Sequence, residues 1–250
     1  MEHVPSDSPL AAGKRAPMSL LTIAGLNLSC GGQQILRDVD LEVEEGSRTC
    51  VMGRSGMGKT TLLKCIMGLL PATTSAMTFD GTDLRALPSD ARAALGIGYV
   101  PQGGEMVPHL TVDENLRAGL ELSAAGPQAV PRLVYDLVPQ LAQMKRRRGE
   151  ELSAGERQQL AIGRALVCEP KLLILDEPTH GIQPALVHEI GTILRDLNTT
   201  LGVTLLLVDN NLPFARRVSS DFRILEEGRI VANGPIEGLT NDIIAEHLST

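Results

Sequence analysis

Residues 53–60 read Gly-Arg-Ser-Gly-Met-Gly-Lys-Thr, and this stretch decides the fold. It matches the pattern G-x-x-x-x-G-K-[ST], in which glycines let backbone N–H groups point at phosphate oxygens. The four residues before it, 49–52, favour a short buried strand. The apolar residues from Leu62 to Leu70 recur at helical spacing until Pro71 ends the run. A strand, a glycine-rich loop and a helix N-terminus in this order predict a phosphate-binding site.

The phosphate-binding residues have distinct predicted roles. Lys59 is expected to reach the β- and γ-phosphates of a nucleotide, and the hydroxyl of Thr60 is expected to hold Mg²⁺. We predict that the nucleotide is bound by Gly53, Arg54, Ser55, Gly56, Met57, Gly58, Lys59, Thr60 and Thr61.

Composition places the chain among ordinary soluble proteins. It has 250 residues, of which 43% are hydrophobic and 21% are charged. A net charge of −7 argues against general nucleic-acid binding, which usually requires a basic surface. The four cysteines form no C-x-x-C pair, which is typical of a reducing compartment. Because no apolar run is long enough to span a bilayer and no signal peptide is evident, we expect a cytosolic protein.

The segments before and after the phosphate loop predict further parts of the fold. Residues 1–17 are rich in Pro, Ser, Ala and Gly, and they predict a disordered tail. Residues 20–28 and 35–43 have β-like patterns around a Gly31-Gly32 turn, and they predict an antiparallel layer. Helical patterns at 111–122 and 132–145 predict a small helical lobe inserted at about residues 103–155.

The apolar runs at 97–100, 172–175 and 203–208 predict the strands of a parallel sheet that is covered on both faces. The second run ends in Asp176-Glu177, at the edge where such sheets place ligands. We expect Asp176 to bind Mg²⁺ through water and Glu177 to act as the general base for the attacking water.

Two segments at the end of the predicted lobe carry further signals. Ser153 and Glu156 have the spacing of a capping box, which predicts a helix that begins at this point. The run Lys-Arg-Arg-Arg at 145–148 favours a solvated face, and a protein or phosphate contact is the alternative.

Four motifs occur together in one order: the phosphate loop, Gln102 after Tyr-Val-Pro, Leu-Ser-Ala-Gly-Glu at 152–156, and Leu-Ile-Leu-Asp-Glu-Pro at 173–178. From about residue 18 onward the chain resembles the ATP-binding cassette (ABC) family, the ATPase subunits of ABC transporters. The resemblance implies one ATP-binding domain over residues 18–250, with ATP and Mg²⁺ as cofactors. Its fold would be α/β: a phosphate-loop NTPase core with a mostly parallel sheet, an N-terminal antiparallel β layer and an inserted helical lobe.

The resemblance also implies roles for individual residues. Ser153 and the N–H group of Gly155 would contact the γ-phosphate of an ATP molecule held by the opposite subunit. Gln102 would complete the shell of the magnesium ion and the attacking water. Four positions depart from the family pattern: Cys30, Asn210, Ala154 in place of the signature's first glycine, and Gln183 where many members have an aspartate. Cys30 stands where an aromatic ring usually stacks on adenine, and Asn210 stands where a switch histidine is expected. A thiol lacks a ring's stacking surface, and an asparagine carries no positive charge.

A narrower resemblance concerns the type of transporter. Residues 98–103, 146–149 and 177–184 resemble one of the two ATPases of branched-chain amino acid and urea importers, and Gly-Ile-Gln-Pro at 181–184 favours the urea type. The implied partners are transmembrane permease subunits and a second ATPase subunit. That second subunit would be a different chain, forming a heterodimer, or another copy of this one. The chain would lie peripherally on the cytoplasmic face of the cell membrane and contact the membrane only through its partners.

Other functional classes fit the sequence less well. A nucleotide-binding subunit that regulates or completes a partner's site is favoured by Asn210 and Cys30, whereas Glu177 argues against it. A cassette protein of DNA repair or translation is disfavoured by the acidic charge and by the lack of coiled-coil or basic insertions. A GTPase is disfavoured because no Asn-Lys-x-Asp motif is present.

Overall fold

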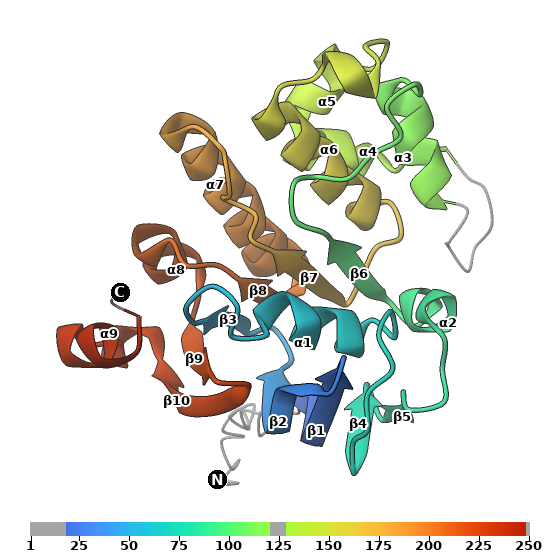
Figure 1. Ribbon diagram of the computed structural model, residues 1–250. Helices are drawn as coiled ribbons and strands as arrows, with labels where there is room; N and C mark the ends of the chain where they lie inside the picture. Colours follow the sequence, from blue (N-terminus) through green and yellow to red (C-terminus); the bar gives the residue numbers. More distant parts are fainter. Residues whose placement is uncertain (1–18, 121–128, 249–250) are drawn as a thin grey trace, which may run out of the picture.

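The centre of the protein is a sheet of six strands in the order β10-β9-β3-β8-β7-β6, counted over the residues that the structure describes (Figure 1). The structure is a computed structural model that describes residues 19–120 and 129–248, so the predicted tail at 1–17 lies outside them. All neighbours from β9 to β6 pair in parallel, and β10 is antiparallel to β9. The strands are β3 (Arg48–Met52), β6 (Ile97–Val100), β7 (Leu172–Asp176), β8 (Thr204–Val208), β9 (Asp221–Glu226) and β10 (Arg229–Pro235).

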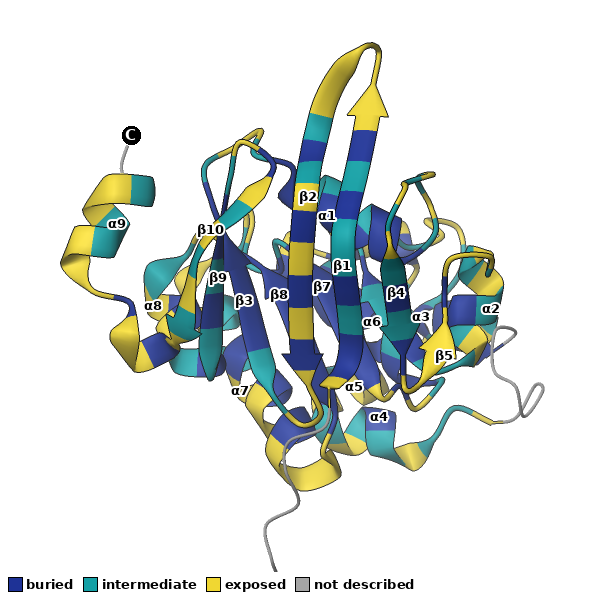
Figure 2. Ribbon diagram, turned by 90° about the horizontal axis from the view of Figure 1, so that it is seen from below, coloured by how far each residue is buried: buried dark blue, intermediate teal, exposed yellow. Residues whose placement is uncertain are grey.

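A second, antiparallel sheet has the order β2-β1-β4-β5. Its strands are β1 (Ser19–Cys30), β2 (Gln33–Glu44), β4 (Ala76–Phe79) and β5 (Thr82–Asp83). The predicted turn between β1 and β2 is confirmed, since Gly31 and Gly32 both have positive φ angles, 57° and 83°. Buried and exposed residues alternate along β2, as Figure 2 shows, because one face of this sheet packs on the core.

Both faces of the parallel sheet are covered, which explains why β7 and β8 are apolar along their whole length. Leu173 and Leu175 belong to the core on the side of the large helices, whereas Leu172 and Ile174 belong to a second core shared with the antiparallel sheet. Helix α1 (Lys59–Ile66) contributes its apolar residues to that second core, between the two sheets (Figure 1). The prediction of a doubly covered parallel sheet is therefore confirmed.

The remaining helices are α2 (Ser89–Ala94), α3 (Val112–Leu120), α4 (Arg132–Leu137), α5 (Pro139–Gln143), α6 (Ala154–Leu166), α7 (Pro184–Leu201), α8 (Leu212–Val218) and α9 (Asn241–His247), with 3-10 turns at Gly149–Glu151 and Ile236–Gly238. Of the remaining helices, α7 and α8 lie on the outer face, α2 lies beside the end of α1, and a separate group lies above β6 (Figure 1). Helices α3, α4, α5 and α6 gather in the upper group (Figure 1). The predicted boundaries of the lobe at residues 103 and 155 stay predictions. Within the described ranges, no helix is both long and apolar enough to cross a bilayer.

One predicted helix is interrupted. The segment 132–145 was expected to be a single helical segment, but it divides into α4 and α5 at Val138. Val138 has φ −128° and ψ 74°, which is outside the helical region. The cause is Pro139, since a proline disfavours helical geometry in the residue before it and lacks an N–H group for the helix.

The cationic run at 145–148 makes contacts inside the lobe. Arg147 forms an ion pair with Glu156 at 2.6 Å, and its guanidinium also donates to the carbonyl of Glu151 at 2.6 Å. The ammonium of Lys145 lies 3.9 Å from the centre of the Tyr135 ring. Lys145, Arg146 and Arg148 are exposed, as expected for a solvated face, while Arg147 ties the run to the start of α6. The alternative of a contact with another protein or a phosphate stays a prediction.

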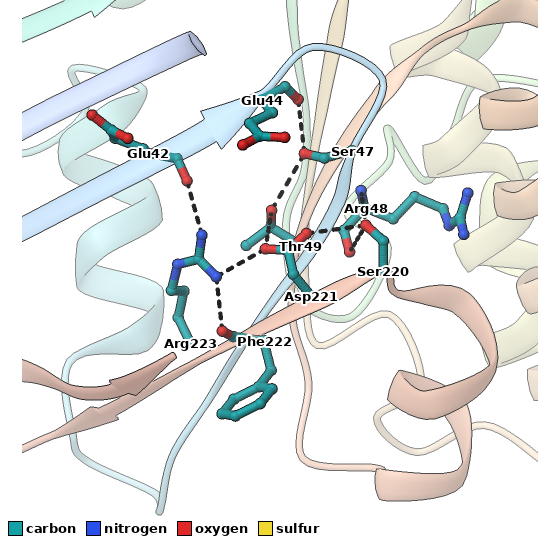
Figure 3. A network of polar contacts seen from close by, with 9 residues as sticks. All are labelled: Glu42, Glu44, Ser47, Arg48, Thr49, Ser220, Asp221, Phe222 and Arg223. Carbon is teal, nitrogen blue, oxygen red and sulfur yellow. Dashed lines mark hydrogen bonds and ion pairs between the residues drawn. The ribbon is translucent and has the colours of Figure 1, made fainter. Parts of the chain in front are cut away.

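A polar network joins the two sheets at the N-terminal end of β3, as Figure 3 shows. The carboxylate of Asp221 on β9 accepts hydrogen bonds from Thr49 on β3 and from Arg223, both at 2.9 Å. Arg223 also donates to the backbone carbonyl of Glu42 on β2 at 3.4 Å. Because the phosphate loop follows the other end of β3, this network fixes the strand that carries the loop.

Candidate active site

Most of the predicted site residues follow four neighbouring strands. The phosphate loop follows β3, Asn210 follows β8, Glu177 follows β7 and Gln102 follows β6. These strands are adjacent in the sheet and parallel, so their carboxyl ends meet at one edge. Residues more than 100 positions apart in sequence are thereby brought to one place.

The backbone of the phosphate loop requires glycine at its two ends. A Cβ atom at Gly53 would lie 2.2 Å from the carbonyl oxygen of Leu225, so any side chain would collide with the backbone of β9. Gly58 has φ 98° and forms the N-terminal cap of α1. The loop thus ends in a left-handed residue directly at the helix N-terminus, which is a geometry suited to an anion.

Lys59 is folded back on its own loop. Its ammonium donates hydrogen bonds to the carbonyl oxygens of Gly53 at 2.6 Å and Arg54 at 3.0 Å. Burial lowers the pKa of Lys59, while the negative charges of Glu177 and Asp176 act in the opposite direction. The side chain is therefore held in place before any nucleotide binds.

The proposed magnesium ligands fit that ion. The hydroxyl of Thr60 donates to Oδ1 of Asp176 at 2.9 Å, and the hydroxyl of Tyr99 donates to Oδ2 at 3.5 Å. Burial raises the pKa of Asp176, and the hydrogen bond from Thr60 opposes that shift. Hydroxyl and carboxylate oxygens are hard donors, and Mg²⁺ typically takes one or two protein ligands beside substrate phosphates and water. Asp176 and Thr60 provide such a pair. Sequence reasoning missed Tyr99, because its motif identified only the neighbouring Gln102.

Glu177 lies beside these groups and has two neighbours of its own. Nε2 of Gln102 donates to Oε2 of Glu177 at 2.7 Å, which leaves the amide oxygen of Gln102 available to a metal ion. Nδ1 of His180 lies 3.4 Å from the same carboxylate oxygen. Glu177 has φ 45°, a left-handed conformation that is uncommon outside glycine, and its N–H group donates to the carbonyl of Val208 at 2.8 Å. Sequence reasoning missed the contact with His180.

A cavity of about 660 Å³ borders these residues, which is within the usual range for small-molecule sites. Its polar lining includes Lys59, Thr60, Gln102 and Glu177. Its other wall is largely aliphatic and contains Cys30. The full lining is Leu28, Ser29, Cys30, Ile35, Ser55, Gly56, Gly58, Lys59, Thr60, Thr61, Leu70, Pro71, Gln102, Glu177 and His180. Apart from Cys30, the residues of the aliphatic wall were not predicted, since they come from β1, β2 and the end of the α1 region and share no motif.

Asn210 is turned toward the phosphate loop. Its Oδ1 accepts a hydrogen bond from the N–H group of Gly53 at 3.4 Å, and the residue is not part of the cavity lining in the described structure. The neighbouring Asp209 is buried and accepts hydrogen bonds from the Thr179 hydroxyl at 2.9 and 2.8 Å. Asp209 therefore anchors the segment that follows Glu177, a connection that sequence reasoning also missed.

Ser153 and Gly155 lie elsewhere. Ser153 caps α6: its Oγ accepts from the N–H group of Glu156 at 3.3 Å, and the Glu156 carboxylate accepts from the N–H group of Ser153 at 2.7 Å. This confirms the predicted capping box. Gly155 is buried, and a Cβ atom there would lie 2.2 Å from Cδ1 of Leu186. Neither residue lines the cavity, so within one chain they are separate from Lys59 and Glu177.

The sequence matches one family model and several ATP-binding proteins of transport systems. Residues 36–180 match the family model described as "ABC transporter". The chain is 38% identical over 202 residues to the high-affinity branched-chain amino acid transport ATP-binding protein BraG of Pseudomonas aeruginosa, a match that covers 80% of this chain and 86% of that one. It is 36% identical to the lipopolysaccharide export system ATP-binding protein LptB of Haemophilus influenzae, and this match covers 90% of this chain and 94% of that one.

A solved structure agrees with these sequence matches. The ADP conformation of MJ1267, an ATP-binding cassette of an ABC transporter, superimposes with a TM-score of 0.78 at 26% identity and covers 92% of this chain and 98% of that one. The family match extends over more than half of the 250 residues, and the phosphate loop, Asp176 and Glu177 lie within it. The chain therefore belongs to the ABC transporter family and is an ATP-binding cassette ATPase.

Proposed function

We propose that this protein is the ATP-hydrolysing subunit of an importer for branched-chain amino acids or urea. In this proposal, ATP closes the subunit against a second ATPase subunit, and closure drives transport through transmembrane permease subunits at the cytoplasmic face of the membrane. The observation that carries it is the arrangement of Lys59, Thr60, Gln102 and Glu177 around one cavity, with Asp176 bonded to Thr60.

The residues divide the chemistry among them. The loop N–H groups and Lys59 hold the phosphates, with α1 directed at them by its N-terminus. Thr60, Asp176 and the amide oxygen of Gln102 would hold Mg²⁺, which neutralises charge on the phosphate oxygens when it is bound. Glu177 accepts the proton of the attacking water, and Gln102 orients its carboxylate.

Two observations bear on the transported solute. The names of BraG and of the probable branched-chain amino acid transport ATP-binding protein LivF of Archaeoglobus fulgidus, which is 35% identical and covers 86% of this chain, support a branched-chain amino acid. Gly-Ile-Gln-Pro at 181–184 supports urea. Uptake of labelled leucine and labelled urea by vesicles that contain the assembled transporter distinguishes the two. ATP-dependent uptake of neither solute would contradict the proposed substrate class.

A second candidate function rests on Asn210 and Cys30. Asn210 bonds to Gly53 instead of lining the cavity, and Cys30 replaces a stacking ring. In this alternative the chain binds nucleotide but hydrolyses it weakly, and its Ser153 completes the site of a non-identical partner. A heterodimer with unequal sites would combine both candidates.

The test of the proposed function is Glu177→Gln. Glutamine preserves the shape of the side chain but does not accept a proton from water, so we expect hydrolysis by the purified chain, measured without a partner ATPase, to fall by about a hundredfold or more while ATP affinity is retained. Glu45→Gln, on an exposed turn, is the matched control and should hydrolyse normally. Near-normal turnover of Glu177→Gln, in an assay that is limited by the chemical step, would contradict the role of Glu177 as the base.

A further inference from the structure

The histidine of the site comes from a turn, not from the end of β8. Residues 177–180 read Glu-Pro-Thr-His, and the N–H group of His180 donates to the backbone carbonyl of Glu177 at 3.0 Å. Pro178 restricts the φ angle at the second position of this turn. The turn brings residue 180 back over residue 177, and this is why the two side chains meet.

The turn is held by buried groups. Thr179 donates its hydroxyl to both carboxylate oxygens of Asp209, at 2.9 and 2.8 Å, and its N–H group donates to Oδ2 at 3.3 Å. Asp209 is itself only 3% exposed at the end of β8, and it also accepts from the N–H group of Asn211 at 2.8 Å. The position of His180 is therefore set by the parallel sheet and not by an unsupported loop.

The imidazole meets the carboxylate of Glu177 on one side only. Nδ1 of His180 lies 3.4 Å from Oε2, the oxygen that also accepts from Gln102 at 2.7 Å. Over residues 19–120 and 129–248, no hydrogen bond or ion pair occupies Oε1. Both His180 and Glu177 line the cavity, and the histidine side chain is 68% exposed there. In the tautomer that carries its proton on Nδ1, His180 faces the same oxygen to which Gln102 donates, so both neighbours hold Oε2 and leave Oε1 to face a water molecule.

We propose that His180 is a positioning residue for Glu177, and that it supplies in this chain the imidazole that position 210 lacks. The inference rests on the proposed function, since it assumes that Glu177 is the base. His180 holds the carboxylate so that Oε1 accepts the proton of the attacking water, while Asn210 supports the first glycine of the phosphate loop.

The test compares ATP hydrolysis by His180→Ala and His180→Asn in the purified full chain, where every active site contains this chain's own Glu177. We expect His180→Ala to lower kcat by about tenfold or more, because misplacement of a reacting group by about 1 Å is costly, and to change KM for ATP by less than about twofold. His180→Asn should retain most of the activity, because its amide N–H occupies the position of Nδ1 and can donate to the same oxygen. His109→Ala, a change of a highly exposed histidine in the helical lobe, is the matched control.

A double variant tests whether a histidine introduced at position 210 can replace His180. Introducing Asn210→His into His180→Ala should recover at least about half of the lost rate, since an imidazole then returns to the site from β8. Full activity of His180→Ala beside inactive Glu177→Gln would overturn this inference and leave the proposed function intact. Active Glu177→Gln would overturn the proposed function instead. Equal loss in His180→Ala and His180→Asn, a loss of ATP affinity, or failure of Asn210→His to restore any activity would also overturn the positioning role.

Discussion

At the scale of single residues, Lys59 illustrates how a binding group is prepared before its ligand arrives. The side chain is buried, its pKa is lowered by burial, and its hydrogen-bond partners are carbonyl oxygens of its own loop. Because its bonded partners are neutral oxygens, the nearby carboxylates of Glu177 and Asp176 offset only part of the cost of burying this charge. The phosphates of a bound nucleotide would supply the compensating negative charge. The favourable interactions of the Lys59 ammonium therefore contribute more to the free energy of nucleotide binding than to the free energy of folding.

We predict that Lys59→Ala weakens ATP binding by at least about tenfold while the chain stays folded. The reason is that a charge-assisted contact to phosphate is lost, whereas folding loses a group that was costly to bury. ATP affinity by titration and the melting temperature without nucleotide are measured together. Lys171→Ala, which breaks an exposed ion pair with Asp80, is the control and should leave ATP affinity unchanged. Unchanged ATP affinity in Lys59→Ala would contradict its assignment.

Cys30 is the second informative residue, because it is an exposed thiol that lines the nucleotide cavity. Cys50 and Cys65 are buried, and burial raises the pKa of the Cys65 thiol to about 11. Burial also raises the pKa of Cys50 and of Cys168. Since the thiolate is the reactive form, these three cysteines should react slowly.

We predict that a maleimide reagent at pH 7.5 modifies Cys30 first, and that ATP slows this reaction by at least about fivefold at a concentration of ten times its dissociation constant. Bound nucleotide would cover the aliphatic wall that contains the thiol. Mass spectrometry of digested samples assigns the modified cysteine. If labelling of Cys30 is equally fast with and without saturating ATP, the base of the nucleotide does not lie against this wall.

At the scale of elements, helix α1 is fastened at both ends. Its N-terminus directly follows the phosphate loop, and the carbonyl groups at its C-terminus accept hydrogen bonds from Arg92 of α2. Nη1 of Arg92 donates to the carbonyl oxygens of Cys65 at 3.0 Å and Ile66 at 2.7 Å, while Nη2 donates to Leu84 at 2.8 Å. A cation at the negative end of the helix dipole stabilises the helix that carries Lys59 and Thr60.

We predict that Arg92→Met lowers the free energy of unfolding by about 2–4 kcal/mol, because it leaves several buried carbonyl groups without a donor. Urea unfolding followed by circular dichroism measures the change. Arg85→Met removes a neighbouring arginine whose ion pair with Asp83 is exposed, so its effect should stay within about 0.5 kcal/mol. Equal effects of the two substitutions would show that Arg92 is not a structural cap.

At the scale of the whole molecule, the site residues divide into two groups. Lys59 and Glu177 border one cavity, whereas Ser153 caps α6 and does not line it. In a closed dimer of the proposed kind, Ser153 would serve the nucleotide of the partner, and Lys59 and Glu177 would serve the chain's own nucleotide. A change at Ser153 and a change at Glu177 then report on different sites.

We predict for the assembled complex with a non-identical partner that Ser153→Ala reduces ATP turnover more than Glu177→Gln does. The physical reason is that Asn210 places less positive charge near the γ-phosphate of this chain's own site, so the partner's site carries more of the turnover. Ser153→Ala also removes a helix cap worth about 1 kcal/mol, so its melting temperature is measured in parallel. Equal losses, together with brisk hydrolysis by the chain alone, would mean that the two sites work alike.

Elements with a strong local pattern were predictable. The strands β6, β7 and β8 follow continuous apolar runs, and the start of α6 follows a capping box. The prediction of one helical segment at 132–145 was wrong. The pattern of apolar residues continues past Val138, but Pro139 interrupts the helix there. Helices α7 and α8 were not predicted as elements, although Pro184 is the first residue of α7 and Pro213 is the second residue of α8.

The sequence by itself determined the phosphate loop, the candidate metal ligands and the candidate base, because each of these depends on residues that are close together in the chain. Only the tertiary structure decided which distant groups meet. Thr60 bonds to Asp176 across 116 positions, and Gln102 bonds to Glu177 across 75 positions. These contacts depend on the order of β3, β8, β7 and β6, which is set by packing on both faces of the sheet. The same packing, which no local pattern encodes, sets three further features. They are the hydrogen bond between Asn210 and Gly53, the aliphatic wall beside Cys30, and the contact between His180 and Glu177.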